Sequence, residues 1–179
     1  MIQKSIFPVA SVAAALLAAA AGTPAAAVGE APTDPQIAHI AYTAGVIDIA
    51  AARQALAKSK NATVRGFAQE MVRDHEAVNV AALDLVKKLK VTPADNPTSA
   101  ALTKQAKADE RRLAALNGRA FDRAYLANEV AYHKAVNAAL DKTLIPSSRN
   151  AELKSLLQTG LKLFREHQSH AEHLAAGLK

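Results

Sequence analysis

The sequence predicts an all-α fold, namely a four-helix bundle built from two helical hairpins with an extra crossover helix between them. Half of the 179 residues are hydrophobic, chiefly Ala and Leu, whereas aromatic residues make up 4% and β-branched runs are scarce. Four long segments carry apolar residues at alternating intervals of three and four, which is the spacing of one helix face. Short turns join the first segment to the second and the third to the fourth, as in paired hairpins.

The N-terminal segment has the layout of a cleaved secretory signal peptide. Lys4 precedes an apolar run that continues to Ala21, and the small-residue triplet Ala25 to Ala27 follows it. The run is shorter than the about 20 residues that a membrane-spanning helix needs. We therefore predict cleavage after Ala27 and a periplasmic or otherwise exported protein that keeps no transmembrane anchor.

Composition excludes several classes of function. Cleavage would remove one of the 22 basic residues and none of the 16 acidic ones, which leaves a net charge of +5. The cations are spread among acids with few aromatic residues for base stacking, so we expect no nucleic-acid partner. Such a surface is either solvated or attracted to an anionic envelope surface or an envelope protein. The absence of Cys excludes disulfides, thiolate nucleophiles and Cys-ligated metals.

The chain after the signal peptide divides into a short leader and one helical domain. Residues 28–35 contain two prolines and are expected to be extended, and the domain covers 36–179. The expected apolar stripes span 37–55, 64–89, 122–140 and 153–178, with a polar covering or crossover helix over 99–116 that stops at Asn117 and Gly118. A linker of about 30 residues is long enough to return along the bundle, but a plain up-down bundle with an added helix fits the same pattern.

Every stripe carries an ionisable residue, which is costly in an apolar core unless the residue is paired or bound to a ligand. These residues are Asp48, His75, Glu129, His133 and His167. At a rise of about 1.5 Å per residue from the hairpin turns, Asp48 and His75 lie at one level, and so do Glu129 and His167. The sequence therefore predicts a mid-bundle cluster to which all four helices contribute.

This cluster has more than one interpretation. Neutral imidazole and carboxylate on facing helices can hold one Zn, Cu, Fe or Mn ion. Alternatively, the same groups form a hydrogen-bonded network that only fixes helix register, or a histidine-based pH sensor. We expect no haem, because Ala-rich stripes pack closely, and no nucleotide, because the sequence has no Gly-rich phosphate loop. It also has no Ser–His–Asp order or paired-carboxylate cleft, so it does not indicate an enzyme.

Four ionisable residues outside the cluster have simpler interpretations. Asp122 is expected near a helix N-terminus, where exposed amides and the helix dipole favour an acid. His170 and His173 are three residues apart and form a candidate chelating pair on the surface. His39 is expected to be exposed.

Several blocks of the sequence carry a family resemblance. Gly45 to Asp48 is similar to a first-helix motif in which a Glu usually stands at the position of Asp48. The most specific block, Val64 to His75, combines a Phe-Ala pair with Met-Val and Asp-His, and further similarity covers Phe121 to His133 and His167 to Ala171. Over about residues 36–175 the chain resembles the domain-of-unknown-function 4142 (DUF4142) family of exported bacterial ferritin-like proteins.

The resemblance implies a ferritin-like bundle in the cell envelope, but it implies no reaction. Di-iron ferritin-like enzymes have a Glu-x-x-His pair on each of two helices. Here Glu129 and His133 are four residues apart, and Val72 stands three residues before His75. The cluster is also richer in imidazole than in carboxylate, which favours a single zinc or copper ion over a bridged iron pair.

Overall fold

The computed structural model describes residues 31–178, so the predicted signal peptide and the start of the leader lie outside the described residues. All regular structure within residues 31–178 is helical, which confirms the all-α prediction. The elements are α1 (Asp34–Lys58), α2 (Ala62–Leu89), α3 (Pro97–Ala114), α4 (Gly118–Ala139), the π-helical turn η1 (Leu140–Leu144), α5 (Ile145–Ser147) and α6 (Ala151–Gly177). None of the helices in this part of the chain combines the length and the apolar character that crossing a membrane requires.

Short polar side chains fix where the helices begin. The side-chain oxygens of Asn61, Asn96 and Asn150 each accept amide hydrogen bonds from the first turn of α2, α3 and α6. At the start of α1 the Asp34 carboxylate reaches further along the chain, because it accepts the backbone amides of Arg149 and Asn150 at 2.9 Å each. This contact ties the first helix to the turn that precedes the last one.

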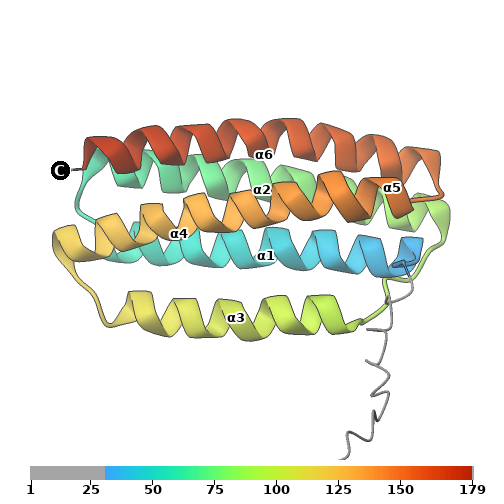
Figure 1. Ribbon diagram of the computed structural model, residues 1–179, viewed down its shortest axis with the longest axis horizontal. Helices are drawn as coiled ribbons and strands as arrows, with labels where there is room; N and C mark the ends of the chain where they lie inside the picture. The colour runs from blue at the N-terminus through green and yellow to red at the C-terminus, as the bar shows by residue number, and fades with distance from the viewer. Residues whose placement is uncertain (1–30, 179) are drawn as a thin grey trace, which may run out of the picture. The chain divides into compact units, whose positions relative to one another are not determined.

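The helices pack lengthwise, as Figure 1 shows. Helix α1 packs along α2, α4 packs along α6, and further contacts join α2 to α6 and α1 to α4. Helix α3 lies on the outer side of α1, on the side away from α6 (Figure 1). It returns the chain along the length of α1, so that α2 and α4 run in the same direction. Helix α3 therefore lies between α2 and α4 in the chain and packs along α1.

Two apolar clusters fill the interior at different heights along the helices. The first contains Ala52, Ala55, Val64, Phe67, Ala68, Met71, Leu113, Phe121, Tyr125, Leu126 and Ala171. The second contains Ile37, Ile40, Leu140, Leu144, Leu153, Leu157, Leu161 and Phe164. On each of α1, α4 and α6 the buried ionisable residues of the predicted cluster fall between these two sets in the sequence. Polar groups thus occupy the middle of an otherwise apolar interior.

Two helix boundaries differ from the expected ones. Helix α1 begins at Asp34, two residues before the expected start, since a proline in the first turn sacrifices no helical hydrogen bond there. Helix α3 ends at Ala114, so Asn117 and Gly118 open α4 instead of closing the helix before it. Gly118 has φ of 53°, a left-handed conformation that a residue without Cβ adopts at little cost.

Helical structure also continues beyond the expected end of α4. Helix α4 continues through the π-helical turn η1 and the short α5, whereas a stop was expected at Ile145 and Pro146. Pro146 has no amide hydrogen to give to the carbonyl four residues earlier, which is a known cause of local helix distortion. The chain then leaves the helix at Ser148, where the backbone becomes extended.

Candidate metal centre

The structure brings all five residues of the predicted cluster together. Asp48 comes from α1, His75 from α2, Glu129 and His133 from α4, and His167 from α6. Each of them is at most 3% exposed. Burial of five ionisable side chains at one level is expensive, so their mutual geometry determines what compensates the cost.

Three ligand atoms form a nearly equilateral triangle. The Nε2 atoms of His75 and His133 are 3.4 Å apart, and Oδ2 of Asp48 lies 3.7 Å from the first and 3.6 Å from the second. The point equidistant from all three lies about 2.1 Å from each atom, within the range of about 2.0 to 2.2 Å at which zinc is bound by imidazole nitrogen and carboxylate oxygen. We call Asp48, His75 and His133 the inner triad.

The inner triad's imidazoles are held in defined orientations. His133 Nδ1 donates to the backbone oxygen of Glu129 at 3.1 Å, which leaves the Nε2 lone pair directed at the triangle. A metal-binding histidine is typically fixed in this way through its other nitrogen. The His75 ring stacks on Phe164 with ring centroids 4.7 Å apart and an angle of 7° between planes. Both rings therefore face the centre of the cluster without a large rearrangement.

His75 and His133 are neutral at physiological pH. Burial, followed by the charges of His133 and His167, lowers the pKa of His75 from 6.5 to about 3. Burial is also the main cause that lowers the pKa of His133 to about 4. Neutral imidazole is the form that ligates metals, so no proton has to leave these rings before an ion binds.

The two buried carboxyl groups hold their protons unusually strongly. Burial raises the pKa of Asp48 from 3.8 to about 7, and the neighbouring Glu129 side chain partly opposes the shift. Burial and the nearby charge of Asp48 raise the pKa of Glu129 well above 4.5. Their oxygens and a His133 nitrogen lie within 4.8 Å of one another. Two carboxyl groups this close in a dry interior cannot both ionise readily unless a cation compensates them.

Several polar atoms in the cluster have no hydrogen-bond partner within the described residues. They are both carboxylate oxygens of Asp48 and of Glu129, and Nδ1 of His75 and of His167. Buried polar atoms without partners are rare in folded proteins, and each costs about 1 to 3 kcal/mol. A network whose only purpose is to fix the fold would be expected to satisfy them.

His167 connects the cluster to the surface between α2 and α6. Its Nε2 lies 3.0 Å from Oδ2 of Asp74, and its ring centroid is 5.4 Å from those of both His75 and His133. Glu70, Asp74 and His167 form a further group whose ligand atoms lie within 4.8 Å of one another. Sequence reasoning missed Glu70 and Asp74, although their spacing of four places them on one face of α2, directly beside Met71 and His75.

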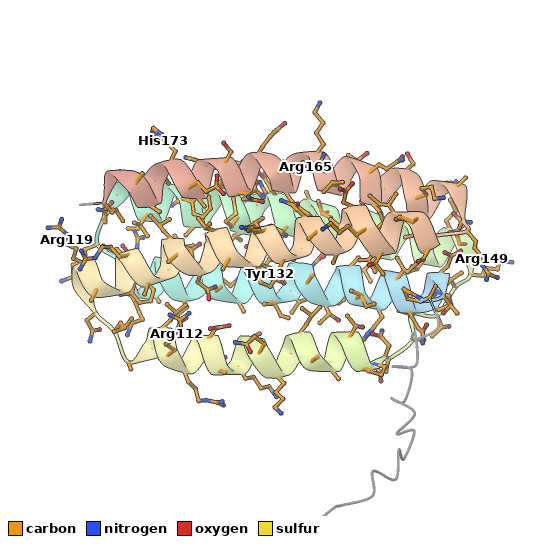
Figure 2. The ribbon with its side chains drawn as sticks, in the orientation of Figure 1. Arg112, Arg119, Tyr132, Arg149, Arg165 and His173 are labelled. Carbon is orange, nitrogen blue, oxygen red and sulfur yellow. The ribbon has the colours of Figure 1, made fainter. Side chains whose placement is uncertain are left out.

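Other polar side chains that sequence reasoning missed lie one turn from the histidines. Asn79 is buried next to Gly45. A Cβ atom added to Gly45 would lie 2.2 Å from Oδ1 of Asn79. Asn137 donates to the backbone oxygen of Phe164 at 3.2 Å and thereby joins α4 to α6. Tyr132, near the middle of α4 in Figure 2, donates its hydroxyl to the Ala44 oxygen at 2.8 Å. The hydrogen bonds of Asn137 and Tyr132 thus join α4 to α6 and to α1 around the cluster.

Two expectations outside the cluster need correction. Asp122 lies in the second turn of α4, beyond the free amides of the helix start, and is buried with Oδ1 unpartnered within the described residues. It is therefore not a capping acid. His39 is only half-exposed, since α3 covers it: Nδ1 lies 3.0 Å from Ser99 Oγ and Nε2 3.1 Å from Asp95 Oδ1.

The expected surface pair of histidines does not face one partner. His173 is exposed and points away from the packed helices in Figure 2. His170 instead turns toward α2, where its Nδ1 lies 2.9 Å from Oε2 of Glu70. The structure thus associates His170 with a carboxylate on a neighbouring helix.

Comparison with known proteins adds a family assignment. The search of curated proteins found no match, and the search of solved structures found none either. The family described as "Domain of unknown function (DUF4142)" matches residues 18–174, which include every residue of the buried cluster. This chain therefore belongs to the DUF4142 family.

Proposed function

We propose that this protein binds one transition-metal ion in its interior, with the inner triad as ligands. The observation that carries the proposal is the triangle of two imidazole nitrogens and one carboxylate oxygen, with sides of 3.4, 3.6 and 3.7 Å. Glu129 and His167 flank this triangle and have unpartnered atoms, so either can supply a fourth ligand. The ion would also compensate the two carboxyl groups that burial otherwise keeps protonated.

The donor set narrows the choice of ion. Imidazole suits Zn, Cu, Fe and Ni, whereas Mg and Ca prefer all-oxygen sites. Within the described residues the buried cluster contains three imidazoles and two carboxyl groups, and this excess of imidazole favours zinc or copper. The spacing of Glu129 and His133 differs from the paired motif of di-iron proteins, so the site is proposed for a single ion.

The wider setting of the proposal is an exported protein of ferritin-like topology that handles metal or protects against stress. The pattern of residues 1–27 supports export, since it has the layout of a signal peptide. The return of the chain through α3, which makes α2 and α4 run in the same direction, supports a ferritin-like crossover. The mildly basic surface is compatible with an anionic envelope partner.

Elemental analysis of the protein purified without a His tag or chelator from its native host tests the proposal. We expect close to one tightly held ion per chain, and its loss in the double variant His75→Leu/His133→Leu. His173→Gln serves as the control, because it removes an exposed histidine from α6 and should leave the metal content unchanged.

The opposite result assigns the cluster to another purpose. If the protein is metal-free and stays so after incubation with zinc, copper, iron and manganese, the proposal fails. The buried groups would then only specify the fold of a non-catalytic envelope module. Circular dichroism of the double variant checks that a loss of metal does not merely report a loss of folding.

A further inference from the structure

A second group of metal-ligating side chains lies on the face where α2 meets α6. Glu70 and Asp74 are one turn apart on α2, and His167 and His170 occupy the facing side of α6. We call these four residues the outer cluster. It contains two imidazoles and two carboxylates, and only His167 also belongs to the buried cluster.

Two direct contacts across the helices organise the outer cluster. Nδ1 of His170 lies 2.9 Å from Oε2 of Glu70, and Nε2 of His167 lies 3.0 Å from Oδ2 of Asp74. The His170 ring meets Phe67 edge to face, with centroids 5.3 Å apart, which holds the ring toward α2. The ligand atoms of Glu70, Asp74 and His167 all lie within 4.8 Å of one another, so one cation can contact all three, and His170 contacts the carboxylate of Glu70 beside them.

The outer cluster becomes steadily less exposed toward the interior. The exposed fraction of the side chain falls from 41% at His170 to 29% at Glu70, 16% at Asp74 and 1% at His167. A hydrated ion can therefore reach the first two side chains directly and meets progressively drier ligands beyond them. Carboxylates at such an opening also raise the local concentration of cations.

His167 is the residue that the outer cluster shares with the buried cluster. Its Nε2 faces Asp74, whereas Nδ1 has no partner within the described residues. The centroids of the His75 and His133 rings lie 5.4 Å from its own. The same imidazole therefore borders both the outer cluster and the inner triad.

Arg73 limits how an ion can occupy the outer cluster. Its guanidinium donates to Asp74 Oδ1 at 2.7 Å and to Oδ2 at 3.1 Å. Because this arginine is 70% exposed at its side chain, it can swing into solvent without opening the helices. An ion that approaches would replace Arg73 as the positive partner of Asp74.

We propose that Glu70, Asp74 and His167, with His170 beside Glu70, form a second, outer site for a divalent transition-metal ion, through which the ion reaches the inner triad. The access part of this proposal rests on the proposed buried site, whereas the outer site itself does not. Removing the charge of Glu70 and the imidazole of His170 should abolish the outer site and leave the inner ligands intact.

Titration of the full chain with Zn²⁺ alone tests the proposal. We expect two ions per wild-type chain, of which the outer one is bound more weakly and is removed first by a competing chelator. The variant Glu70→Gln/His170→Gln should bind one ion and load it about tenfold or more slowly at low salt, since it lacks the acidic opening. Asp84→Asn/His173→Gln is the matched control, because it also removes one acid from α2 and one histidine from α6, both exposed.

The metal content of the two double variants distinguishes the outer site from the inner one. In His75→Leu/His133→Leu, one weak ion should remain, which shows the outer site even where the inner one is lost. If Glu70→Gln/His170→Gln binds as many ions as wild type, the outer site does not exist. If the variant loses one ion but loads the other at the wild-type rate, the access role is overturned.

Discussion

Asp48 and the histidines around it respond to pH in opposite directions. In the folded protein Asp48 keeps its proton up to a pKa of about 7, whereas His75 and His133 take one up only near pKa values of about 3 and 4. In the unfolded chain these groups titrate near their ordinary values. In the metal-free protein, Asp48 should therefore lower the free energy of unfolding as pH rises, and the histidines should lower it as pH falls. Single substitutions separate these two contributions.

The first prediction concerns Asp48→Asn. The folded pKa of Asp48 lies above its unfolded value, so its contribution to stability is present at low pH and is lost as pH rises toward 7. In chelator, wild type should lose stability relative to Asp48→Asn between pH 5 and 7, by up to about 1.4 kcal/mol per pH unit. Urea unfolding at several pH values measures the difference in stability between the two proteins. The contributions of the histidines cancel in this difference, because both proteins contain them. Parallel curves would contradict the prediction.

The second prediction has the opposite sign. The folded pKa of His75 lies below its unfolded value of 6.5, so its contribution is present above pH 6.5 and is lost as pH falls. Metal-free wild type should lose stability relative to His75→Leu between pH 6.5 and 5, again by up to about 1.4 kcal/mol per pH unit. The same unfolding series tests it. A difference that does not change over this range would contradict the prediction, because it would mean that His75 takes up its proton as readily in the folded protein as in the unfolded chain.

At the level of the helices, the close approach of α1 to α2 depends on Gly45. A Cβ atom there would lie 2.2 Å from Oδ1, 2.8 Å from Cγ and 2.9 Å from Nδ2 of Asn79. Asn79 is buried, so its amide has little room to withdraw. The glycine thus sets the distance between the two helices that carry Asp48 and His75.

We expect Gly45→Ala to destabilise the fold by about 1 to 3 kcal/mol, because it forces Asn79 and α2 outward. Gly66→Ala is the control on α2, since nothing lies within 4 Å of a Cβ there, and it should stabilise by about 0.5 to 1 kcal/mol. Thermal unfolding of both variants gives the comparison. Equal effects of the two substitutions would mean that the contact at Gly45 relaxes without cost.

Much of the fold and of the site was predictable from spacing. The alternation of three and four residues identified Asp48, His75, Glu129, His133 and His167, and the structure buries all five at one level. Counting along helices sufficed for this because the rise per residue is constant. Whether these residues bind metal stays a prediction.

The rest depended on contacts between helices that a single sequence does not encode visibly. Glu70 and Asp74 lie one position away from the apolar stripe, and they join the site only because α6 is rotated to place His167 and His170 against them. The residue types of Asn117 and Gly118 predict a helix end, although the same types also begin helices, as they do here. Local residue preferences do not separate these cases.

On the scale of the whole molecule, the polar layer is enclosed by apolar clusters on both sides along the helices. This arrangement keeps the inner triad away from bulk solvent, and electrostatic interactions are stronger in such a buried environment. It also leaves the α2 and α6 face as the place where the cluster approaches solvent, through Asp74 and Glu70. The residues of this polar layer all lie within the region that matches the DUF4142 family, which is described only as a domain of unknown function.

Export is the other property of the whole molecule that can be tested directly. Cleavage after Ala27 would give a mature chain that starts at Val28 and retains all residues of both proposed sites. Intact-mass spectrometry of the protein recovered from the periplasm or medium of its host should show this N-terminus. Recovery of the uncleaved chain from the cytoplasm would contradict the predicted signal peptide.

A crystal structure of the Zn²⁺-loaded protein, with anomalous diffraction data at the zinc absorption edge, tests most directly whether the inner triad binds a metal ion. We predict an anomalous peak in the interior, about 2.0 to 2.2 Å from Nε2 of His75, Nε2 of His133 and Oδ2 of Asp48. Peaks confined to the surface, or an interior without any peak in a zinc-saturated crystal, would contradict the buried metal centre.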